Sequence, residues 1–286
     1  MNIIKNEPMK NHTTFKIGGP CDEFCEAESI EDILSALKYA KTKNIPVFVM
    51  GNGSNLLVSD KGIRGLVLKI SDKFSKCEFC GNTAKAQSGI LLSTLSKMAQ
   101  KKSLSGLEFA GGIPGSLGGA IYMNAGAYGG EMKDVIKSVT YLENGEIKKI
   151  EKDFGFGYRK SIFTDTDAII LEAEIELKDG DSHEIQAKME DFKNRRIEKQ
   201  PLSMPSAGST FKRPEGYFAG KLIEDAGLKG CFIGGAKVSE KHSGFIVNTG
   251  NATAQDVLSL IRHIQKTVEE KFGVELKTEV KIVGDF

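Results

Sequence analysis

The sequence is poor in the features that mark several common classes of protein. It contains no run of about 18 apolar residues, the length of a membrane-spanning helix, and residues 1–14 lack the apolar core of a signal peptide. Its 39 Lys and Arg residues are balanced by 38 Asp and Glu residues, which leaves a net charge of +1. Without a net field, the chain has no general attraction to nucleic acid or to a membrane surface. We therefore expect a cytoplasmic protein without nucleic-acid or membrane partners.

Cysteine and histidine are also too few to organise the fold or a metal site. Five cysteines are an odd number, which argues against a disulfide framework. Cys77 and Cys80 form a CxxC motif, but no His pair stands at ligand spacing near it. Reduced thiols on a short strand–turn–strand are the favoured interpretation, and a zinc site is the alternative. With four His in the whole chain, we expect no metal.

Glycine, in contrast, is concentrated in residues 106–130. Nine of these 25 residues are Gly, whereas average usage is about 7%. Apolar and aromatic residues are interleaved among them, and a flexible linker has no use for that much burial. We interpret the segment as ordered backbone in which Gly permits positive φ or the close approach of another body. That body could be a neighbouring strand or a ligand.

A second glycine cluster, GNGSN at 51–55, follows an apolar strand predicted at 45–50. Glycine turns at strand ends bind phosphates in α/β proteins through backbone N–H groups. The cluster matches half of GxGxxG and leads into a strand, LLV, which excludes a Rossmann fingerprint; a plain hairpin turn remains the alternative. If 51–55 and 111–119 converge, the ligand is long and carries a pyrophosphate. A non-Rossmann dinucleotide, FAD above all, fits best.

Hydrophobic periodicity predicts an alternation of helices and strands without an internal repeat, and 286 residues favour two cores. Helices are predicted at 30–43, 89–101, 185–200, 217–226 and 254–272. Strands are predicted at 45–50, 56–58, 66–70, 76–79, 83–87 and 168–177, with a hairpin across 135–150 and two short strands in 231–238. A final alternating strand is predicted at 274–283.

Seven blocks of the sequence carry a resemblance to a known family. They are NHTTFKIGGP, VMGNGSNLLVSD, GLEFAGGIPGSLGGAIYMNAGAYGGE, FGYRKSIF, SAGSTFKRP, AGKLIEDAGLKGCFIGGAKVSEKHSGFIVN and LKTEVKIVG. In this order, over roughly residues 11–284, they resemble the UDP-N-acetylenolpyruvoylglucosamine reductases. The resemblance implies an α+β fold with an FAD-binding domain of the vanillyl-alcohol-oxidase type. Its two subdomains are expected at 1–70 and 71–184, followed by an α+β substrate-binding domain at 185–286.

The resemblance also implies an activity, the reduction of UDP-N-acetylglucosamine enolpyruvate to UDP-N-acetylmuramate for peptidoglycan synthesis. NADPH gives a hydride to flavin N5, NADP leaves, and N5 then delivers hydride to the enolpyruvyl methylene carbon in the same slot. Some oxidases of this fold tether flavin through a His in the loop that matches 51–55. That loop has no His here, so we expect non-covalent FAD. A monomer is the default expectation.

Three residues match the family's catalytic positions. Arg159 would bind the substrate carboxylate through a bidentate fork as negative charge develops. Ser209 would protonate the developing carbanion; because a hydroxyl is a poor acid, it needs nearby positive charge, for which Lys212 and Arg213 are candidates. Glu279 would help to polarise the enol. Without the resemblance, these three residues would be interpreted as a surface Arg, a turn Ser and a solvated Glu.

Further positions follow from the glycine clusters and from the basic residues of the last third. The expected cofactor-binding residues are Gly51, Asn52, Gly53, Ser54, Asn55, Gly111, Gly112, Pro114, Gly115, Ser116, Gly118, Gly119, Ala120, Asn124, Gly126 and Ala127. The expected substrate-binding residues are Tyr158, Lys212, Arg213, Lys221 and His242. For individual glycines of the segment 106–130, Gly106 and Gly130 especially, packing against a strand remains the alternative.

The chain departs from longer family members in one respect. It lacks their insertion, whose Tyr closes over the bound sugar nucleotide, so Tyr158 or Tyr217 are the candidates to cover the substrate. Two other functions remain open from the sequence. One is a flavin oxidase of the same fold acting on another small molecule, and the other is a flavin-free protein that binds a sugar nucleotide.

Overall fold

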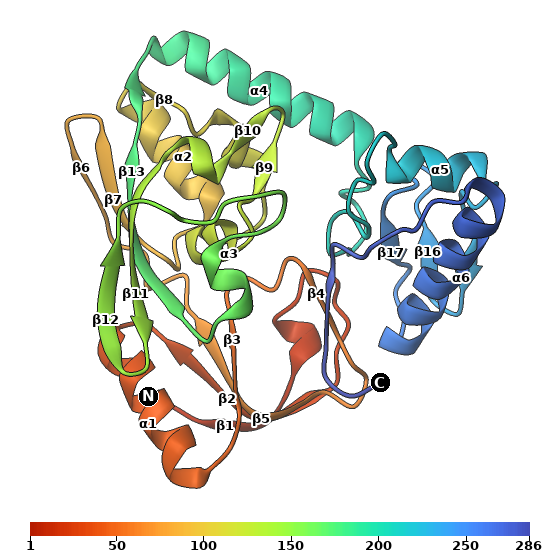
Figure 1. The fold of residues 1–286 in the computed structure, drawn as a ribbon, viewed down its shortest axis with the longest axis horizontal. Coiled ribbons are helices and arrows are strands. Elements are labelled where there is room, and N and C mark those ends of the chain that lie inside the picture. The colour runs from red at the N-terminus through yellow and green to blue at the C-terminus, as the bar shows by residue number, and fades with distance from the viewer. The chain divides into compact units, whose positions relative to one another are not determined.

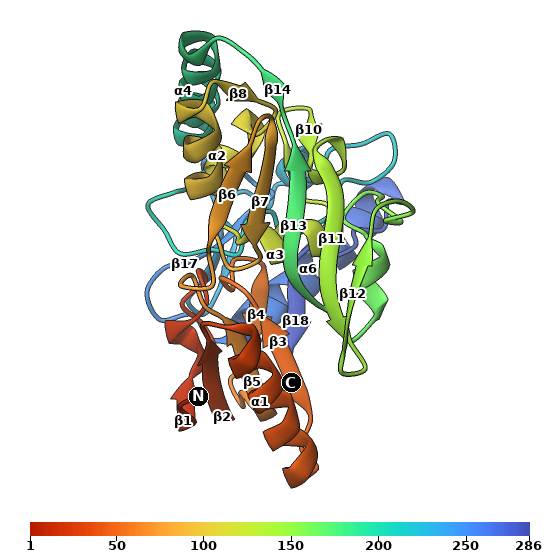
Figure 2. The same ribbon diagram turned by 90° about the vertical axis from the view of Figure 1, so that its left-hand side faces the viewer.

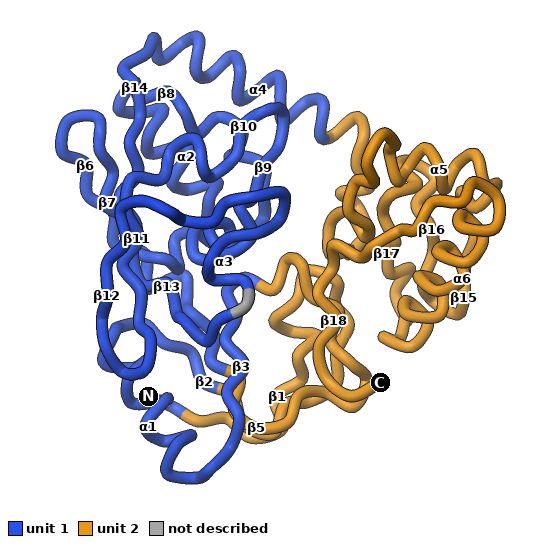
Figure 3. Tube along the Cα trace, viewed as in Figure 1, with its two compact units in different colours: residues 1–2, 25–52, 68–196 blue, residues 3–24, 53–67, 197–286 orange. Residues whose placement is uncertain are grey.

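The structure is a computed structural model that describes residues 1–164 and 166–286, together with the place of Asp165 at the end of a short helix. The chain is a mixture of helices and strands (Figure 1) and divides into two compact units (Figure 3). Unit 1 consists of residues 1–2, 25–52 and 68–196, and unit 2 of residues 3–24, 53–67 and 197–286. Each unit is therefore assembled from three separate stretches of sequence.

Unit 1 contains a five-stranded antiparallel sheet in the order β12-β11-β13-β7-β6 (Figure 2). Its strands are β6 (Cys77–Cys80), β7 (Thr83–Gln87), β11 (Ile136–Glu143), β12 (Glu146–Ile150) and β13 (Ile169–Glu176). The hairpin between β11 and β12 turns at Asn144 and Gly145, whose φ angles are 53° and 82°. Positive φ at both central residues suits the twist of a two-residue hairpin. The predicted hairpin is confirmed, and so is the strand–turn–strand around the CxxC motif.

The helices of unit 1 include α1 (Ile30–Lys43), α2 (Leu92–Lys101) and α3 (Leu117–Tyr122), and α4 (Ser182–Lys199) begins in this unit. Helix α1 begins as predicted, because the hydroxyl of Ser29 accepts a hydrogen bond from the N–H of Asp32 at 3.1 Å. Helix α2 begins three residues later than predicted. At Gly89 a Cβ would lie 2.0 Å from the oxygen of Ser71, so this Gly serves close packing before the helix. The core of the unit is a continuous apolar cluster that includes Leu95 and Ile175.

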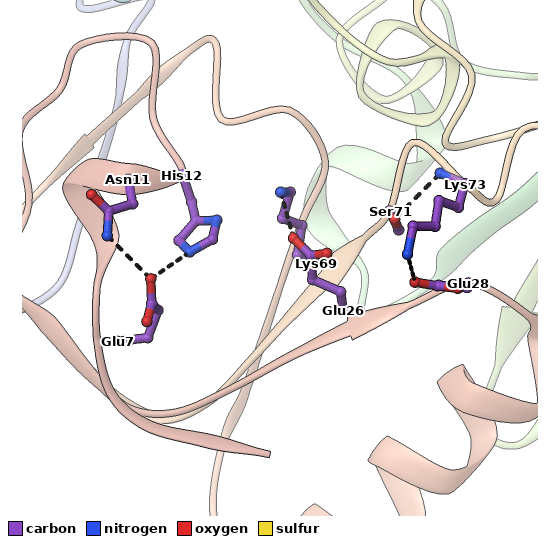
Figure 4. Close-up of polar contacts among 8 residues, drawn as sticks. All are labelled: Glu7, Asn11, His12, Glu26, Glu28, Lys69, Ser71 and Lys73. Carbon is purple, nitrogen blue, oxygen red and sulfur yellow. Dashed lines mark hydrogen bonds and ion pairs between the residues drawn. The ribbon is translucent and has the colours of Figure 1, made fainter. Parts of the chain in front are cut away.

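A four-stranded sheet has the order β1-β2-β5-β3. Its strands are β1 (Ile4–Pro8), β2 (Pro20–Ala27), β3 (Val47–Met50) and β5 (Ile63–Ile70). Lys69 pairs with Glu26 at 2.7 Å and Lys73 with Glu28 at 2.5 Å, and near β1 Glu7 accepts from Asn11 and contacts His12 (Figure 4). Most of these side chains are partly exposed, so each ion pair contributes only about 0–1 kcal/mol to stability.

Unit 2 packs two helices with a three-stranded sheet in the order β15-β16-β17. The elements are α5 (Ala219–Asp225), β15 (Phe232–Ile233), β16 (Ala236–Val238), β17 (Ile246–Asn248) and α6 (Ala254–Phe272). Thr253 caps α6 and Gly273 ends it at φ 66°, as predicted. The carboxylate of Asp60 also accepts from the N–H groups of Ala254 at 2.8 Å and Gln255 at 2.9 Å. A carboxylate at this position neutralises the positive end of the helix dipole.

The strand predicted at 274–283 is largely wrong. Only β18 (Lys281–Val283) is a strand, parallel to β4 (Leu56–Val58), and an isolated bridge joins Thr278 to Phe211. Leu276 and Val280 are buried as the alternation implies, but Ile282 is 40% exposed. The alternation breaks because β18 has a single partner strand over three residues, so only part of the pattern faces a core.

The remaining elements are short. They are η1 (Met9–Asn11), β8 (Leu104–Ser105), η2 (Glu108–Gly112), β9 (Gly126–Ala127), β10 (Gly130–Glu131), η3 (Met132–Asp134), η4 (Ile162–Asp165) and β14 (Lys178–Asp179). Helix α3, LGGAIY, was not predicted, because two adjacent glycines cost it about 2 kcal/mol of helix propensity. None of the described helices has the length and apolarity that a membrane crossing requires.

Candidate active site

The two glycine clusters meet within unit 1. The side-chain amide of Asn52, just after β3, donates a hydrogen bond of 2.6 Å to the carbonyl oxygen of Pro114. A Cβ at Gly51 would lie 2.4 Å from the hydroxyl oxygen of Ser116, so no larger residue fits there without a shift. The convergence that a pyrophosphate ligand requires is therefore present between residues 51–52 and 114–116.

The turn after β3 also offers unused hydrogen-bond donors. Among the described residues, no backbone carbonyl accepts from the N–H groups of Asn52, Gly53 or Ser54. Gly53 adopts φ +62°, the left-handed conformation in which successive N–H groups can form an anion-binding nest. The first N–H groups of α3 are used within the protein, since Leu117 donates to Ile90 and Gly118 to Ser88, both at 2.8 Å. The 52–54 turn therefore fits a phosphate of FAD better than the N-terminus of α3 does.

Much of the glycine excess in 106–130 is explained by packing against protein. A Cβ would lie 3.1 Å from Arg196 at Gly112, 3.0 Å from Ser88 at Gly118, 2.7 Å from Glu131 at Gly126 and 2.6 Å from Phe109 at Gly130. Gly119 is different, because the nearest atom to its Cβ would be the Ser116 hydroxyl oxygen at 3.8 Å. A Cβ at Gly129 would meet no atom of the described residues within 4 Å, so Gly119 and Gly129 are two glycines of this segment that leave room for another body.

The expected cofactor-binding residues fall in a few short segments. They are Gly51 and Asn52 after β3, Gly53, Ser54 and Asn55 before β4, Gly111 and Gly112 in η2, Pro114, Gly115 and Ser116 before α3, Gly118, Gly119 and Ala120 in α3, Asn124 after it, and Gly126 and Ala127 in β9. Residues 53–55 belong to unit 2 and the others to unit 1.

Arg159 occupies a tight turn in unit 1. Gly157 and Lys160 form an antiparallel bridge, with Gly157 N–H donating to Lys160 at 3.0 Å and Lys160 N–H donating back at 3.3 Å. Arg159 itself has φ +55°, a conformation that favours Gly or Asn and costs an Arg about 1–2 kcal/mol. Its guanidinium carbon lies 5.1 Å from the ring centre of Tyr158, which is half exposed. A strained, non-glycine turn residue is typical of a functional position.

Asn124 connects this turn to the glycine-rich segment. Its side-chain nitrogen donates to the Gly157 oxygen at 3.0 Å and to the Glu131 carboxylate at 2.9 Å, and its side-chain oxygen accepts from the Lys133 N–H at 2.9 Å. Its exposed fraction is 1%. Both of its amide donors are thus committed within the protein, so the structure assigns the side chain to protein contacts.

Glu131 is a residue that the sequence analysis did not single out. Its pKa is lowered, mainly by Lys133, whose ammonium lies 2.9 Å from the carboxylate, and further by Asn124 and by the charge of Arg159. No local pattern in the sequence distinguishes Glu131 from other charged turn residues. Only the fold brings its charge near Arg159.

Ser209 and Glu279 lie on paired segments of unit 2. The N–H of Glu279 donates to the oxygen of Thr210 at 2.8 Å, and Phe211 bridges to Thr278. Lys212 extends the pairing, because its N–H donates to the oxygen of Lys277 at 2.8 Å. The two candidate catalytic residues therefore stand on adjacent segments, both half-buried. The solvated position that alternation alone implied for Glu279 is wrong.

Asn55 fixes the same pair from a third segment. Its side-chain nitrogen donates to the oxygen of Glu279 at 3.0 Å, and its own carbonyl accepts from the N–H of Lys281 at 2.9 Å. Thr210 is buried and adds two bonds, donating its N–H to Gly244 at 2.9 Å and accepting from the Ile246 N–H at 3.1 Å. The segments that carry Ser209 and Glu279 are thus held by backbone pairing and by the side chains of Asn55 and Thr210.

The candidate substrate-binding cations of unit 2 differ in their environments. Lys221 pairs with Asp225 at 2.6 Å, and the guanidinium carbon of Arg213 lies 4.0 Å from the ring centre of Phe218. The ring of His242 accepts at Nδ1 from the N–H of Gly244 at 3.0 Å, and burial lowers its pKa. A neutral His242 offers a hydrogen bond from Nε2 but no charge to a diphosphate.

Arg196 is the second residue that sequence reasoning missed. It belongs to unit 1, where a Cβ at Gly112 would lie 3.1 Å from its Nη1, and burial lowers the pKa of its guanidinium. The α4 sequence is strongly charged, which hides a single inward-facing Arg. The thiol of Cys77, in contrast, carries no unusual reactivity, because burial raises its pKa to about 11.

Comparison with known proteins assigns a class. Residues 22–151 match the model of an FAD binding domain. Residues 200–283 match the C-terminal domain of UDP-N-acetylenolpyruvoylglucosamine reductase. Together with the N–H donors of the 52–54 turn, these matches make the chain an FAD-dependent oxidoreductase, with an FAD binding domain followed by a second α+β domain.

Whole-chain relatives specify the family. Proteins named UDP-N-acetylenolpyruvoylglucosamine reductase from Alkaliphilus oremlandii and Caldanaerobacter subterraneus subsp. tengcongensis are each 57% identical over 285 residues, covering 99% of this chain and 94% of the relative. The crystal structure of UDP-N-acetylenolpyruvylglucosamine reductase from Thermus caldophilus superposes with a TM-score of 0.85 at 36% identity, over 99% of this chain and 98% of that one. The chain belongs to the UDP-N-acetylenolpyruvoylglucosamine reductase family. The predicted fold class, FAD and oxidoreductase activity are confirmed.

Proposed function

We propose that the chain reduces UDP-N-acetylglucosamine enolpyruvate to UDP-N-acetylmuramate for peptidoglycan synthesis, with NADPH as the electron donor. The names of relatives that are 57% identical over nearly the whole chain support this substrate. The observation that carries it is the pairing of the two segments of unit 2 that bear Ser209 and Glu279, through the Glu279 N–H to the Thr210 oxygen and the bridge of Phe211 to Thr278. Family membership favours the reductase over an oxidase for another small molecule or a flavin-free binding protein.

The chain's own groups provide the binding of FAD. The N–H groups of Asn52, Gly53 and Ser54 would bind its pyrophosphate, and Gly119 would admit its close approach. When bound, FAD supplies the hydride that reaches the enolpyruvyl methylene carbon. Because 51–55 contains no His, we expect the binding to be non-covalent.

Ser209 would donate a proton to the carbon next to the methylene group. Gly208 precedes it at φ +78°, and the hydrogen bonds of Thr210 fix the backbone that follows, so the hydroxyl is held on a defined turn. An unperturbed hydroxyl is a weak acid, and a neighbouring cation would make the transfer easier. Lys212 and Arg213 are the candidates nearest in sequence.

Arg159 and Glu279 would act on the charge that develops during hydride transfer. The planar guanidinium can bind the substrate carboxylate through two parallel hydrogen bonds, which strengthen as negative charge spreads onto that carboxylate. Glu279 would help to polarise the enol. Removal of one such electrostatic donor typically costs about 10²–10³ in kcat.

Binding of the sugar nucleotide would fall to basic and aromatic residues of both units. Tyr158, Lys212, Arg213, Lys221 and His242 would bind the sugar nucleotide, with Tyr158 or Tyr217 covering it; both tyrosines are half exposed. A monomeric state, a cytoplasmic location and a division into 1–70, 71–184 and 185–286 stay predictions.

Ser209→Ala separates the two halves of the reaction. In a stopped-flow experiment, NADPH should bleach the flavin of the variant at the wild-type rate. Reoxidation by the enolpyruvyl substrate should fall by about 10²–10⁴-fold, the usual contribution of a positioned acid. Ser203→Ala, at an exposed position of the same unit, is the matched control and should leave both rates unchanged. Near-normal reoxidation in Ser209→Ala would exclude Ser209 as the proton donor.

A further inference from the structure

The end of helix α3 holds the turn of Arg159 at two points. Asn124, two residues after α3, donates to the Gly157 oxygen at 3.0 Å, before the turn. After the turn, the hydroxyl of Ser161 donates to the oxygen of Tyr122 at 2.8 Å. Residues 122–124 therefore fix both ends of the short segment 157–161, whose middle is Tyr158 and Arg159.

Both contacts depend on buried side chains, those of Asn124 and Ser161, and the contact from Asn124 belongs to a larger network. Asn124 is 1% exposed and uses both amide donors and its oxygen in the contacts with Gly157, Glu131 and Lys133. Its backbone adopts φ +45°, a conformation that Asn tolerates better than most residues. Among the described residues, loss of this side chain would leave the Gly157 oxygen with only the turn bond from the Lys160 N–H at 3.3 Å.

Electrostatics connect the same network to Arg159. The Glu131 carboxylate, bound by Asn124 at 2.9 Å, feels the positive charge of Arg159, which contributes to lowering the Glu131 pKa. Asn124 thus fixes both the turn that bears the guanidinium and a carboxylate within electrostatic reach of it.

We propose that Asn124 is a positioning residue that acts through Arg159. It does so by fastening the 157–160 turn to the end of α3. This inference rests on the proposed role of Arg159 in binding the enolpyruvyl carboxylate. A bidentate contact needs the guanidinium in one orientation, and Arg159 stands in a turn at positive φ that must be held from outside. A displacement of about 1 Å at such a group can cost about 10²-fold in rate.

Asn124→Gly tests the proposal because Gly keeps the positive φ and removes only the side chain. We expect flavin reduction by NADPH to stay within about twofold of wild type, and reoxidation by the enolpyruvyl substrate to slow by about 10- to 100-fold. Amide hydrogen exchange at residues 157–160 should speed up, a readout that does not depend on turnover. Asn144→Gly is the matched control, since Asn144 also has positive φ, at 53°, in the β11–β12 hairpin, and should change neither half-reaction.

A double-mutant cycle with Arg159→Ala shows whether Asn124 acts through Arg159. In the Arg159→Ala background, Asn124→Gly should slow reoxidation by less than twofold, because the group it positions is gone. A full additional loss in that background, or equal slowing of both half-reactions by Asn124→Gly alone, overturns the inference. So does wild-type reoxidation in Asn124→Gly.

Two further outcomes are distinguishable. If Arg159→Ala leaves reoxidation unchanged, the proposed role of Arg159 is wrong and the inference falls with it. If Asn124→Gly does not fold, Asn124→Asp replaces it, because Asp keeps the volume and the oxygen that faces Lys133 but offers no donor to Gly157. The rates of both half-reactions and the double-mutant cycle with Arg159→Ala are then measured on Asn124→Asp, with the same expected and contradicting results.

Discussion

In unit 1 the turn of Arg159 is fastened by the side chains of Asn124 and Ser161, whereas in unit 2 backbone hydrogen bonds join the segments that carry Ser209 and Glu279. Asn124 reaches across to the Gly157 oxygen, but Glu279 is bonded through its own N–H to Thr210. A backbone contact survives most substitutions and a side-chain contact does not. The two regions should therefore respond differently to mutation: one substitution can release Arg159, while the Ser209–Glu279 pair should tolerate the loss of any single side chain around it.

The largest effect is expected for the substitution Thr210→Val, and it is an effect on the free energy of unfolding. Thr210→Val keeps the shape of the side chain but removes the hydroxyl that accepts from the Ile246 N–H at 3.1 Å. A buried donor left without an acceptor costs about 1–3 kcal/mol, so the free energy of unfolding should fall by that amount in urea titrations. Reoxidation should slow by less than about threefold, under 1 kcal/mol in the barrier, because the Glu279–Thr210 backbone bond remains. A reoxidation loss as large as that of Asn124→Gly would break the contrast.

A smaller effect is expected from Asn55→Ala. It removes the 3.0 Å bond to the Glu279 oxygen but leaves the Lys281 bond to the Asn55 carbonyl and the pairing with Thr210. Reoxidation should slow by about two- to fivefold, or less than 1 kcal/mol, measured in the stopped-flow assay beside Asn124→Gly. Asn82→Ala, which removes a 3.1 Å bond to the Leu177 oxygen in unit 1, is the control and should leave reoxidation at the wild-type rate. A loss of tenfold or more in Asn55→Ala would show that unit 2 also relies on a side chain.

The smallest expected effect is the contribution of Glu131 to the pH dependence of stability. The folded-state pKa of Glu131 is lowered, mainly by Lys133, so its ionised form stabilises the fold above the unfolded pKa of about 4.3 and this contribution is lost as pH falls through the folded pKa. Glu131→Gln lacks that titration. The stability advantage of wild type, about 0.2–1 kcal/mol at pH 7 for such a partly exposed pair, should shrink on acidification below about pH 4.3.

Paired urea titrations at pH 7 and pH 3.5 check this prediction. Glu143→Gln is the comparison variant, since Glu143 pairs with Lys148 at 2.7 Å in the hairpin, away from the Arg159 turn. Only Glu131→Gln should also slow reoxidation. If the stability advantage of wild type over Glu131→Gln grew on acidification, the ionised Glu131 carboxylate would be destabilised in the folded protein, contrary to this prediction.

Local sequence signals predicted those parts of the fold that are decided locally. Thr253 and Gly273 bound α6 because a capping hydroxyl and a left-handed Gly act within one turn of the helix. Asn144 and Gly145 likewise set the hairpin without distant partners. Helix α3 escaped prediction because burial of Leu117 and Ile121 in the core of unit 1 compensates for two glycines, and burial is a tertiary property.

The candidate site was predictable only in part for the same reason. The glycine clusters could be recognised as backbone for close approach, but which of the glycines faces protein was visible only in the structure: Gly118 meets Ser88, whereas Gly119 has room. The link from Asn124 to Gly157 spans 33 residues and no periodicity encodes it. Arg159, Ser209 and Glu279 were named through the family resemblance, and no local pattern would have selected them.

The three-segment build of each unit has a consequence for how the chain becomes folded during synthesis. Unit 1 has all its residues once position 196 has left the ribosome, whereas unit 2 combines residues 3–24 with its last 90. Asn248 donates to the Phe15 oxygen at 3.2 Å across 233 residues, and β18 pairs with β4, so the early segments of unit 2 wait for partners that are made much later. Contacts of such long sequence separation form slowly. Nascent unit 2 is therefore the part of this chain that should depend most on protection from aggregation until residues 197–286 have been made.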